Sequence, residues 1–474
     1  MDNFACTSDD WFSDTENKMI KLDLYKNKNV GIVGLGMTGK AVADALIASG
    51  AKVTVFDDFK TTDEKYAKFW ADSENFNFKN LDLLIVSPGI HLCWEKPHKT
   101  VQSANFHNIC IRNDLDIFQQ HTKGKKICIT GTNGKSTTTA LIGHVLKNCE
   151  KNSDIGGNFG IPLLSLENNR AFYVIELSSY TLESCTILGF DTAILLNLAE
   201  DHLHRHGGTA GYVAVKQKIF ANFNERSNAI ISIDDEYCRE IFKFLKDIKH
   251  PNIVPISGRE VPTDGVGWNE NDQLVDNKFS KTTVICEKSE MLDGPHNRQN
   301  IAAAYVACIL NGVEQKEFCK ALKTFKGLEH RQELVTTING VQYINDSKAT
   351  NSQSVEQALI RYDNMHLILG GRMKENGING LEKYFHKVKR VFLIGEAAEE
   401  FQKFLKMHSA WSKISGTLEQ ALNDSQELLA VEDNDVRTVL FSPACSSFDQ
   451  FKNFEERGEF FKNLVKKMEK KSEC

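Results

Sequence analysis

The chain has no Cys-x-x-Cys pair, although its 474 residues include twelve cysteines spread from Cys6 to Cys474. This spacing argues against a zinc site or a disulfide framework and favours a reducing compartment. The N-terminal stretch before Met19 is acidic and has no apolar centre, so it does not resemble a signal peptide. No apolar run reaches the length of a membrane span. We therefore expect a cytoplasmic protein that does not insert into membranes.

An excess of positive charge is also missing, because the formal net charge is −6, with 57 Lys and Arg against 63 Asp and Glu. A mildly acidic chain does not favour nucleic acid or an anionic membrane as a partner. Any anionic substrate must therefore meet local cations. The length exceeds what one hydrophobic core supports, so we expect roughly two to four domains.

The stretch ITGTNGKSTTTA, residues 129–140, organises the rest of the chain. It predicts a short strand, a glycine turn and a helix that begins at Lys135, which together form a cradle for phosphate. Lys135 would neutralise terminal phosphate oxygens, and a hydroxyl of the helix start would meet Mg²⁺. Ile129 replaces the first glycine of the usual Walker A pattern, and the alternative is a glycine turn beside a solvated lysine. The predicted nucleotide-binding residues are Gly131, Thr132, Asn133, Gly134, Lys135, Ser136 and Thr137.

A second glycine turn, Gly34-x-Gly36-x-x-Gly39, lies between a predicted strand and helix near the N-terminus. The next predicted strand ends at Asp57, which completes a Rossmann-type unit. The glycines and the helix start suit a diphosphate, and the carboxylate suits a ribose hydroxyl. Taken alone, this pattern favours NAD. A further strand within 81–90 ends near Ser87, again at the edge where ligands bind parallel sheets.

Polar clusters follow the predicted strands of the middle of the chain. Glu176 ends one strand, and His202 follows an acidic pair after the next. A carboxylate at such a strand end holds Mg²⁺ in phosphoryl-transfer sites. Lys216 and Lys218 lie on a predicted helix, where the structural alternative is a solvated face. The start of a later helix carries Asn297 and Asn300 in the motif GPHNRQN.

The last third of the chain repeats the alternation of strand and helix. One predicted strand ends at Asp346, and others precede Arg372 and the motif that contains Ser447. Alternating strands and helices predict an α/β protein with mostly parallel sheets covered on both faces. We therefore expect the polar clusters to gather at the carboxyl edges of these sheets.

The assembled motifs resemble the Mur ligase family over roughly residues 28 to 470, through TGTNGKST, ELSSYTLE, NLAEDHLHRH, GPHNRQN, GLEHR, NDSKATN and SPACSSFDQFKNFEERG. The last two motifs and GLGMTG are most similar to the D-glutamate-adding members. The resemblance implies an N-terminal extension (1–27), a Rossmann-like UDP-substrate domain (28–118), a central P-loop ATPase domain (119–326) and a C-terminal Rossmann-like domain (327–474). It also replaces NAD with a UDP diphosphate at the first glycine turn.

The resemblance further implies an ATP-dependent ligase of peptidoglycan precursor synthesis, whose substrates are UDP-N-acetylmuramoyl-L-alanine, D-glutamate and ATP. ATP would phosphorylate the alanyl carboxylate, and the amine of D-glutamate would attack the acyl phosphate through a tetrahedral intermediate. ADP and phosphate would be released. Two Mg²⁺ ions are implied as cofactors, no nucleic acid is involved, and a monomer is expected.

Residue roles are implied in the same way. Catalysis is assigned to Lys135, Glu176, His202 and Lys216; of these, Glu176 and His202 would bind metal together with Ser136. Lys216 would join them if it carries a carbamate. Binding of ATP beyond the cradle is assigned to Asn297, Asn300, Arg331 and Asp346. The UDP substrate is assigned to Gly36, Met37, Thr38, Asp57, Asp58, Ser87, Asn158 and Ser178, and D-glutamate to Lys348, Thr350, Lys374, Ser447 and Phe454.

One departure from the family pattern is Arg372, which stands where several members have an acid. We expect it to pair with a neighbouring acid or with a substrate carboxylate. Three alternatives remain open: another Mur-type or folylpolyglutamate-type amide ligase, an NAD-dependent oxidoreductase, and a catalytically silent nucleotide-binding module. The oxidoreductase leaves the ATP cradle and Glu176 unexplained, and a silent module would be expected to have lost part of the phosphoryl-transfer set.

Overall fold

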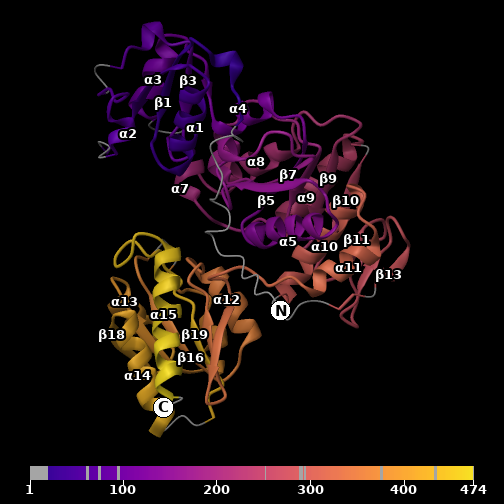
Figure 1. The fold of residues 1–474 in the computed structure, drawn as a ribbon. Helices are drawn as coiled ribbons and strands as arrows, with labels where there is room; N and C mark the ends of the chain where they lie inside the picture. Colours follow the sequence, from indigo (N-terminus) through magenta and orange to yellow (C-terminus); the bar gives the residue numbers. More distant parts are fainter. Residues whose placement is uncertain are drawn as a thin grey trace. The chain divides into compact units, whose positions relative to one another are not determined.

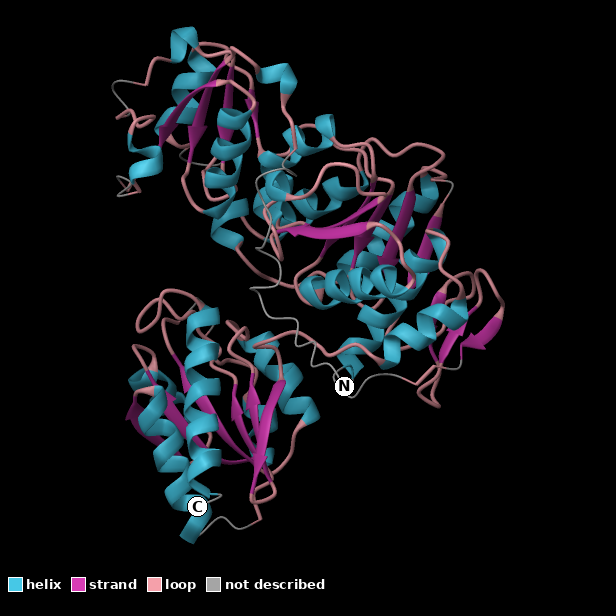
Figure 2. Cartoon of the chain, viewed as in Figure 1, coloured by secondary structure: helices cyan, strands magenta, loops and turns pink. Residues whose placement is uncertain are grey.

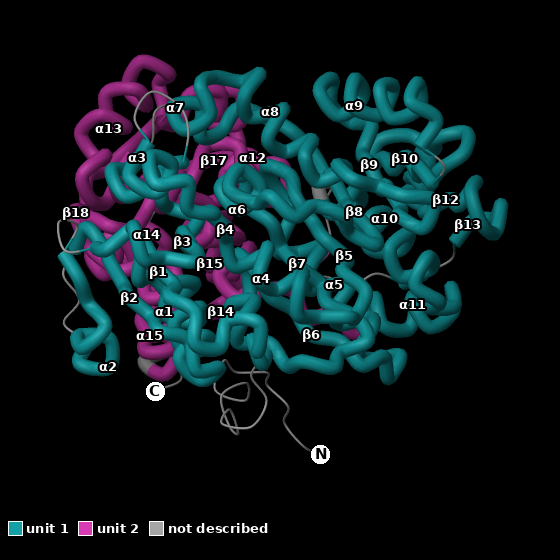
Figure 3. The backbone as a smooth tube through the Cα atoms, turned by 90° about the horizontal axis from the view of Figure 1, so that it is seen from above, with its two compact units in different colours: residues 1–287, 297–323 teal, residues 288–296, 324–474 magenta. Residues whose placement is uncertain are grey.

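The computed structural model describes residues 20–59, 63–72, 76–92, 97–250, 252–284, 286–287, 292, 295–373, 377–431 and 435–472. The chain forms two compact units, shown in Figure 3. The first comprises residues 1–287 and 297–323, and the second comprises residues 288–296 and 324–474. Each unit is built from sheets flanked by helices (Figure 2).

The first unit begins with a parallel sheet of the order β2-β1-β3-β4 within the described residues. Successive residues of its strands face opposite sides, so Ile32 packs with α1 while Val33 packs with α3. Both faces are therefore apolar, as a covered parallel sheet requires. The elements are β1 (Asn29–Val33), α1 (Met37–Ala48), β2 (Lys52–Phe56), α2 (Glu64–Ala67), β3 (Leu83–Val86), α3 (Lys99–Phe106), β4 (Ile111–Arg112) and α4 (Asp114–His121).

The second sheet of this unit has the order β13-β12-β11-β10-β9-β8-β5-β7-β6 in the described chain. It is parallel from β6 to β11, and only its last two pairs are antiparallel. Its strands are β5 (Lys125–Thr130), β6 (Ser153–Gly157), β7 (Phe172–Glu176), β8 (Thr192–Leu195), β9 (Asn228–Ser232), β10 (Ile253–Ile256), β11 (Val266–Trp268), β12 (Leu274–Asp276) and β13 (Thr282–Val284). Its helices are α5 (Lys135–Asn148), α6 (Ser179–Ser184), α7 (Leu203–His206), α8 (Thr209–Gln217), α9 (Glu236–Asp247), α10 (Pro295–Leu310) and α11 (Gln315–Lys323).

The second unit contains a sheet of the order β14-β15-β19-β16-β17-β18, parallel except for the β14–β15 pair (Figure 1). Helices α12 and α13 cover one face through Leu359 and Phe401, and α14 and α15 cover the other through Leu422 and Phe461. The elements are β14 (Glu333–Ile338), β15 (Val341–Asn345), α12 (Ser352–Arg361), β16 (Met365–Gly370), β17 (Val388–Ile394), α13 (Ala398–Met407), β18 (Ser412–Gly416), α14 (Leu418–Val431), β19 (Thr438–Phe441) and α15 (Phe454–Ser472).

The predicted α/β class with mostly parallel sheets is confirmed, and each of the three predicted folded domains contains one of the three sheets. The domain boundaries stay a prediction, and the one at residue 118 falls inside α4. One disulfide joins Cys286 to Cys319, so the expectation drawn from cysteine spacing is wrong for this pair. The seven other cysteines in the described part of the chain are free thiols. Within the same residues, no helix is long and apolar enough to cross a membrane.

Candidate active site

The predicted phosphate cradle lies between β5 and α5, as its sequence indicates. Gly131 has φ 152° and Gly134 has φ 84°, a left-handed conformation that favours glycine. A Cβ atom on Gly134 would lie 2.2 Å from Oδ1 of Asn300, which projects from α10. Asn300 also accepts a hydrogen bond from Thr138 and donates one to Asn297. Asn300 therefore lies directly against the cradle, and Asn297 is hydrogen-bonded to Asn300.

Asn197, which the sequence analysis did not single out, fixes the conformation of this loop. Its carbonyl and side-chain oxygens accept hydrogen bonds of 2.8 Å from the N–H groups of Thr132 and Asn133. Its amide nitrogen donates to the carbonyl of Asn133 and to Gln299 of α10. Asn197 follows β8 in the NLAEDH motif, so its place after a strand was the signal available in the sequence.

Two lysines converge on the carbonyl oxygen of Gly131. Lys135 Nζ lies 2.9 Å from it and 2.8 Å from the carbonyl of Thr132. Lys216, from α8, lies 2.9 Å from the same oxygen and 2.9 Å from Thr130 Oγ1. Its pKa is lowered well below the usual value, first because burial disfavours the charged form and then because of the charge of Lys135.

The alternative of a solvated lysine is therefore wrong for Lys216, whose exposed fraction is 2%. Lys218 serves a different purpose. Its amine donates to the carbonyls of Leu182, Glu183 and Cys185 at the end of α6. Only the first of the two lysines reaches the cradle.

Glu176 ends β7 beside the cradle, because β7 pairs with β5 so that Glu176 lies opposite Ile129. The carboxylate is buried, and its Oε1 accepts a 2.8 Å hydrogen bond from Asn158 Nδ2. The pairing of β6 with β7 brings the asparagine to this edge. Parallel pairing thus gathers the nucleotide cradle, a carboxylate and Asn158 at one edge of the sheet.

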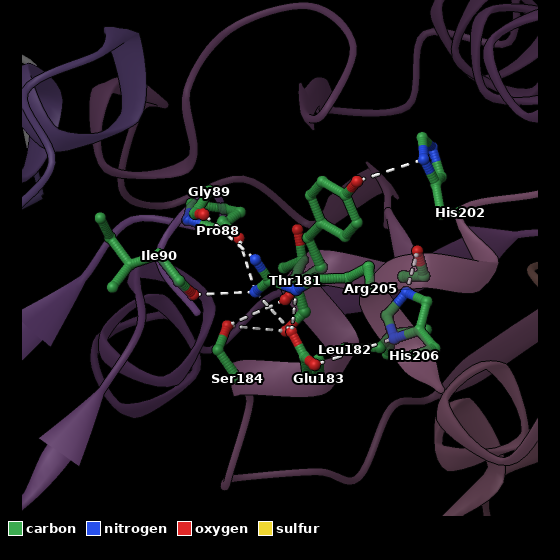
Figure 4. A network of polar contacts seen from close by, with 12 residues as sticks. Pro88, Gly89, Ile90, Thr181, Leu182, Glu183, Ser184, His202, Arg205 and His206 are labelled. Carbon is green, nitrogen blue, oxygen red and sulfur yellow. Dashed lines mark hydrogen bonds and ion pairs between the residues drawn. The ribbon is translucent and has the colours of Figure 1, made fainter. Parts of the chain in front are cut away.

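His202 immediately precedes α7 and has the left-handed φ of 53°, which is uncommon for a residue with a side chain. Its Nδ1 is 3.1 Å from the hydroxyl of Tyr180, and its Nε2 is 3.5 Å from Asp201. Figure 4 shows that Arg205, three residues along, reaches toward the loop Pro88–Ile90 of the first sheet. Neither Tyr180 nor Arg205 was predicted as a site residue.

In the first sheet, the predicted UDP-binding residues surround the glycine turn after β1. Asp57 accepts hydrogen bonds from the N–H groups of Leu35, at 2.6 Å, and Phe59, so its carboxylate fixes the turn itself. Ser87 donates a 2.8 Å bond to the carbonyl of Gly34. Asp58 lies 3.2 Å from the ring of His98.

The remaining members of this group are placed less specifically. Gly36 precedes α1, and a Cβ atom built there would meet nothing within 4 Å. Met37, the first residue of that helix, is 82% exposed, and Thr38 follows it. Ser178 is the N-cap of α6, where its hydroxyl accepts a hydrogen bond from the N–H of Thr181. That capping contact accounts for this serine without a ligand.

The residues predicted to bind nucleotide in the second unit meet at the end of β15. Asp346 is buried and accepts hydrogen bonds from Ser442 Oγ, at 2.7 Å, and from the N–H of Gln332. Burial raises the pKa of Asp346 to about 7, although the Ser442 hydrogen bond and the charge of Arg331 oppose the shift. Arg331 and Asp346 are therefore neighbours, as expected of residues that act together.

Of the residues assigned to D-glutamate, Lys348 and Phe454 lie close together at the start of α15. Lys348 Nζ lies 5.2 Å from the centre of the Phe454 ring. Ser447 is buried in the loop after β19, Thr350 lies two residues beyond Lys348, and Lys374 lies outside the described residues.

A residue that the sequence analysis missed, Arg457, ties these loops together. Its guanidinium donates to Ser347 Oγ, to the Ser347 carbonyl at 2.7 Å and to the Cys445 carbonyl. The side chain is 1% exposed, and Nη1 has no hydrogen-bond partner among the residues that the structure describes. Burial lowers the pKa of Arg457 to about 10. A buried cation therefore joins the loop that contains Ser347 to the loop that contains Cys445.

The expectation for Arg372 is confirmed in its first form, because its guanidinium makes two 3.1 Å hydrogen bonds to Glu396. Both side chains are more than half exposed. Among the described residues, Glu329, His330 and Glu459 could also hold a cation. Lys462 already donates to both of these carboxylates, which makes the cluster an ion-pair network.

Two family models match the chain. The Mur ligase middle domain covers residues 129–308, which include the cradle, Glu176, His202, Lys216 and Asn300. The NAD-binding domain of D-isomer specific 2-hydroxyacid dehydrogenases matches residues 3–87, which include the first glycine turn. The second match reflects the ambiguity of that turn, whose geometry suits a diphosphate of either ligand.

Proteins named UDP-N-acetylmuramoylalanine–D-glutamate ligase are similar to nearly the whole chain. Those of Caulobacter vibrioides and Paramagnetospirillum magneticum are 39% and 41% identical to it over 94% of its length, and over 97% and 98% of their own. Among solved structures, UDP-N-acetylmuramate-alanine ligase of Thermotoga maritima matches with a TM-score of 0.60 and 18% identity, over 93% of this chain and 99% of its own. MurF of Acinetobacter baumannii matches with a TM-score of 0.59 and 18% identity, over 94% and 92%. The chain therefore belongs to the Mur ligase family.

Proposed function

We propose that the protein is an ATP-dependent amide ligase that joins D-glutamate to UDP-N-acetylmuramoyl-L-alanine and releases ADP and phosphate, as a step of peptidoglycan precursor synthesis. The observation that carries this proposal is the convergence of Lys135, Lys216 and Glu176 on one sheet edge. The identity of the substrates is supported by relatives of that name at 39–41% identity over nearly their full length.

The reaction brings two anions together, the γ-phosphate of ATP and the alanyl carboxylate, so it requires preorganised cations. Lys135, at the start of α5, would neutralise the β- and γ-phosphates, whose oxygens the N–H groups of the cradle would bind. Transfer of the phosphoryl group to the carboxylate gives an acyl phosphate. The D-glutamate amine then attacks its carbonyl carbon, and the tetrahedral intermediate expels phosphate to form the amide.

The candidate ligands fit two Mg²⁺ ions, which prefer oxygen ligands. A buried carboxylate and the hydroxyls at the helix start offer oxygen, and a single imidazole offers nitrogen. Ser136 or Thr137 would hold one ion, and Glu176 and His202 the other. The ions would neutralise charge on the transferring phosphoryl group. The hydrogen bond from Asn158 to Glu176 orients the carboxylate. If Nδ1 of His202 donates its proton to the hydroxyl oxygen of Tyr180, Nε2 has the lone pair that would bind the ion.

Lys216 is proposed to carry a carbamate. Burial lowers the pKa of the Lys216 amine and so favours its neutral form, which is the form that attacks CO₂. The nitrogen forms a bond to carbon and loses a proton, so a neutral side chain becomes an anion. That anion would supply an oxygen ligand beside Glu176 and His202.

For the second unit we propose that Arg331 and Asp346 bind the adenine nucleotide, and that Lys348, Thr350, Lys374, Ser447 and the backbone at Phe454 bind D-glutamate. A dicarboxylate requires cations, and Lys348 and Lys374 supply them. We propose further that the UDP moiety binds at the turn Gly34–Thr38, with Asp57, Asp58, Ser87 and Ser178 around the substrate. We propose finally that the protein is a monomer and lies in the cytoplasm.

The test is phosphate release from ATP in the presence of UDP-N-acetylmuramoyl-L-alanine and one amino acid at a time. We expect release with D-glutamate and little with L-glutamate, L-lysine or D-alanine. Absence of ATP consumption with D-glutamate would overturn the proposal. Because the first glycine turn also matches an NAD-binding model, competition of UDP and NADH for the protein is measured in parallel, and we expect only UDP to bind.

A further inference from the structure

Arg205 connects the first sheet of the first unit to the helices that carry the predicted metal site (Figure 4). Its side chain is 3% exposed and donates to three consecutive carbonyls, those of Pro88, Gly89 and Ile90, the last at 2.8 Å. The guanidinium also donates to Glu183 of α6 at 2.5 and 2.8 Å. Because the guanidinium is planar and its donors point in fixed directions, these partners together fix its orientation.

The loop that Arg205 holds is part of the proposed UDP-substrate site. It directly follows Ser87, whose hydroxyl donates to the carbonyl of Gly34 in the glycine turn. Three consecutive carbonyls bound to one rigid group fix the backbone of this loop in a single conformation. The position of Arg205 therefore determines where the loop and the turn behind it lie relative to α7.

The other side of Arg205 faces the proposed metal site. Its guanidinium carbon lies 4.7 Å from the centre of the Tyr180 ring, within the range of a cation–π contact. The hydroxyl of that tyrosine is 3.1 Å from Nδ1 of His202. Tyr180 and Glu183 lie on the same short helix, so α6 presents both the ring and the carboxylate to one guanidinium.

We infer that Arg205 is a positioning residue that couples the substrate loop Ser87–Ile90 to the metal-binding His202, and so sets the acceptor carboxylate against the ion. This inference rests on the proposed function. Its physical basis is that phosphoryl transfer requires the acceptor and the metal in one geometry, which two separate sheets of the chain must supply together. Loss of a contact one step removed from a metal ligand, such as that of Tyr180 with His202, changes metal affinity or activity by about 10- to 100-fold. Arg205 acts on that contact through the Tyr180 ring.

The test compares Arg205→Lys with the double variant Arg205→Met/Glu183→Gln. The double variant is needed because Arg205→Met alone would remove the guanidinium that pairs with the buried Glu183 carboxylate, which impairs folding. The readouts are kcat, the KM values of UDP-N-acetylmuramoyl-L-alanine and ATP, the Mg²⁺ concentration at half-maximal rate, and UDP binding by calorimetry. Arg170→Lys, at an arginine paired with Asp154 and Glu167, is the matched control.

We expect both Arg205 variants to lower kcat about 10- to 100-fold and to require more Mg²⁺, while the KM of ATP stays within about twofold. Tyr180→Phe should raise the Mg²⁺ requirement alone, and Arg170→Lys should change nothing. Unchanged kcat and Mg²⁺ requirement in a folded double variant would overturn the inference and leave the proposed function intact. If the protein without substitutions binds UDP but consumes no ATP, the proposed function is overturned, and the coupling role of Arg205 with it.

Discussion

The amine of Lys216 lies 2.9 Å from the hydroxyl oxygen of Thr130, the last residue of the strand that leads into the cradle. That hydroxyl donates its own proton to the carbonyl of Leu177, just beyond Glu176. The lysine is therefore held between the nucleotide loop and the end of β7 by groups that carry no charge. Such surroundings favour the neutral amine, on which the first prediction depends.

We predict that Lys216→Ala loses nearly all activity and that short carboxylic acids such as formate and acetate partly restore it. The small acid would occupy the space of the side chain and supply the missing carboxylate oxygen. Phosphate release at increasing acid concentration is the measurement. Lys218→Ala is the control, because that amine binds carbonyls of α6, and acids should have no effect on it. A folded Lys216→Ala protein that no acid restores would count against the carbamate.

Gly134→Ala should abolish ATP binding, because the new methyl group would lie 2.2 Å from Oδ1 of Asn300. Gly340→Ala is a close match for its backbone effect, since Gly340 has φ 81° and nothing within 4 Å of its Cβ position. That variant should lose only about 1–2 kcal/mol of stability, the cost of a left-handed alanine. Calorimetric titration with ATP separates the two, and equal ATP affinities would show that the approach of α10 to the cradle is unimportant.

Arg457→Lys should raise the KM of D-glutamate about tenfold or more while the KM of ATP is unchanged. The lysine keeps the charge but cannot bond Ser347 and the Cys445 carbonyl together, which costs roughly 1.5–3 kcal/mol for a hydrogen bond to a charged group. Steady-state kinetics with each substrate varied is the measurement. Arg372→Ala serves as the comparison, because its exposed pair with Glu396 predicts an unchanged KM. Equal effects of the two substitutions would contradict this assignment.

We expect the protein to lose stability as the pH falls from 6.5 to about 4, because the imidazole of His206 is buried. Burial lowers the pKa of His206 to about 4, from the 6.5 of an exposed histidine. The unfolded state therefore binds more protons between these values, and stability is lost as the pH falls through that window. The shift corresponds to roughly 3 kcal/mol.

Urea unfolding of the protein and of His206→Gln between pH 4.5 and 7 tests this dependence. The glutamine variant should lose stability less steeply as the pH falls. The exposed His408→Gln variant controls for the removal of a histidine as such. Parallel curves for the protein and His206→Gln would exclude the buried imidazole as the cause.

Much of the fold follows from the sequence, because an apolar run that ends in glycine and a polar cluster marks both a buried strand and its carboxyl edge. That rule placed Glu176 and Asp346 at strand ends, where the structure has them. It was wrong for His202, because β8 ends at Leu195 and His202 immediately precedes α7. The stabilising contacts were less accessible. Arg205 and Arg457 bind backbone carbonyls of loops far away in the chain, and such partners have no sequence signal. Asn197 had only its place after a strand to mark it.

The first glycine turn shows a different limit. Its glycine spacing specifies a backbone that can approach a diphosphate. NAD and a UDP-linked sugar both contain a diphosphate, so the spacing does not distinguish them. Lys216 shows the reverse case, since helical periodicity alone suggested a solvated face while packing against the cradle buries it. Whether such a residue is buried or solvated depends on its position relative to strands that are distant in the sequence. A local sequence pattern does not contain that information.

The carbonyl oxygen of Gly131 accepts hydrogen bonds from both Lys135 and Lys216. This one oxygen thus holds the Lys135 amine, proposed to bind phosphate, and the Lys216 amine, proposed to carry a carbamate. A change in the position of this oxygen would therefore affect both amines. A substitution that shifts this peptide to accommodate another nucleotide would also displace the amine on α8. Engineering of altered nucleotide preference in this chain should therefore begin at α10, around Asn297, and leave the shared peptide untouched.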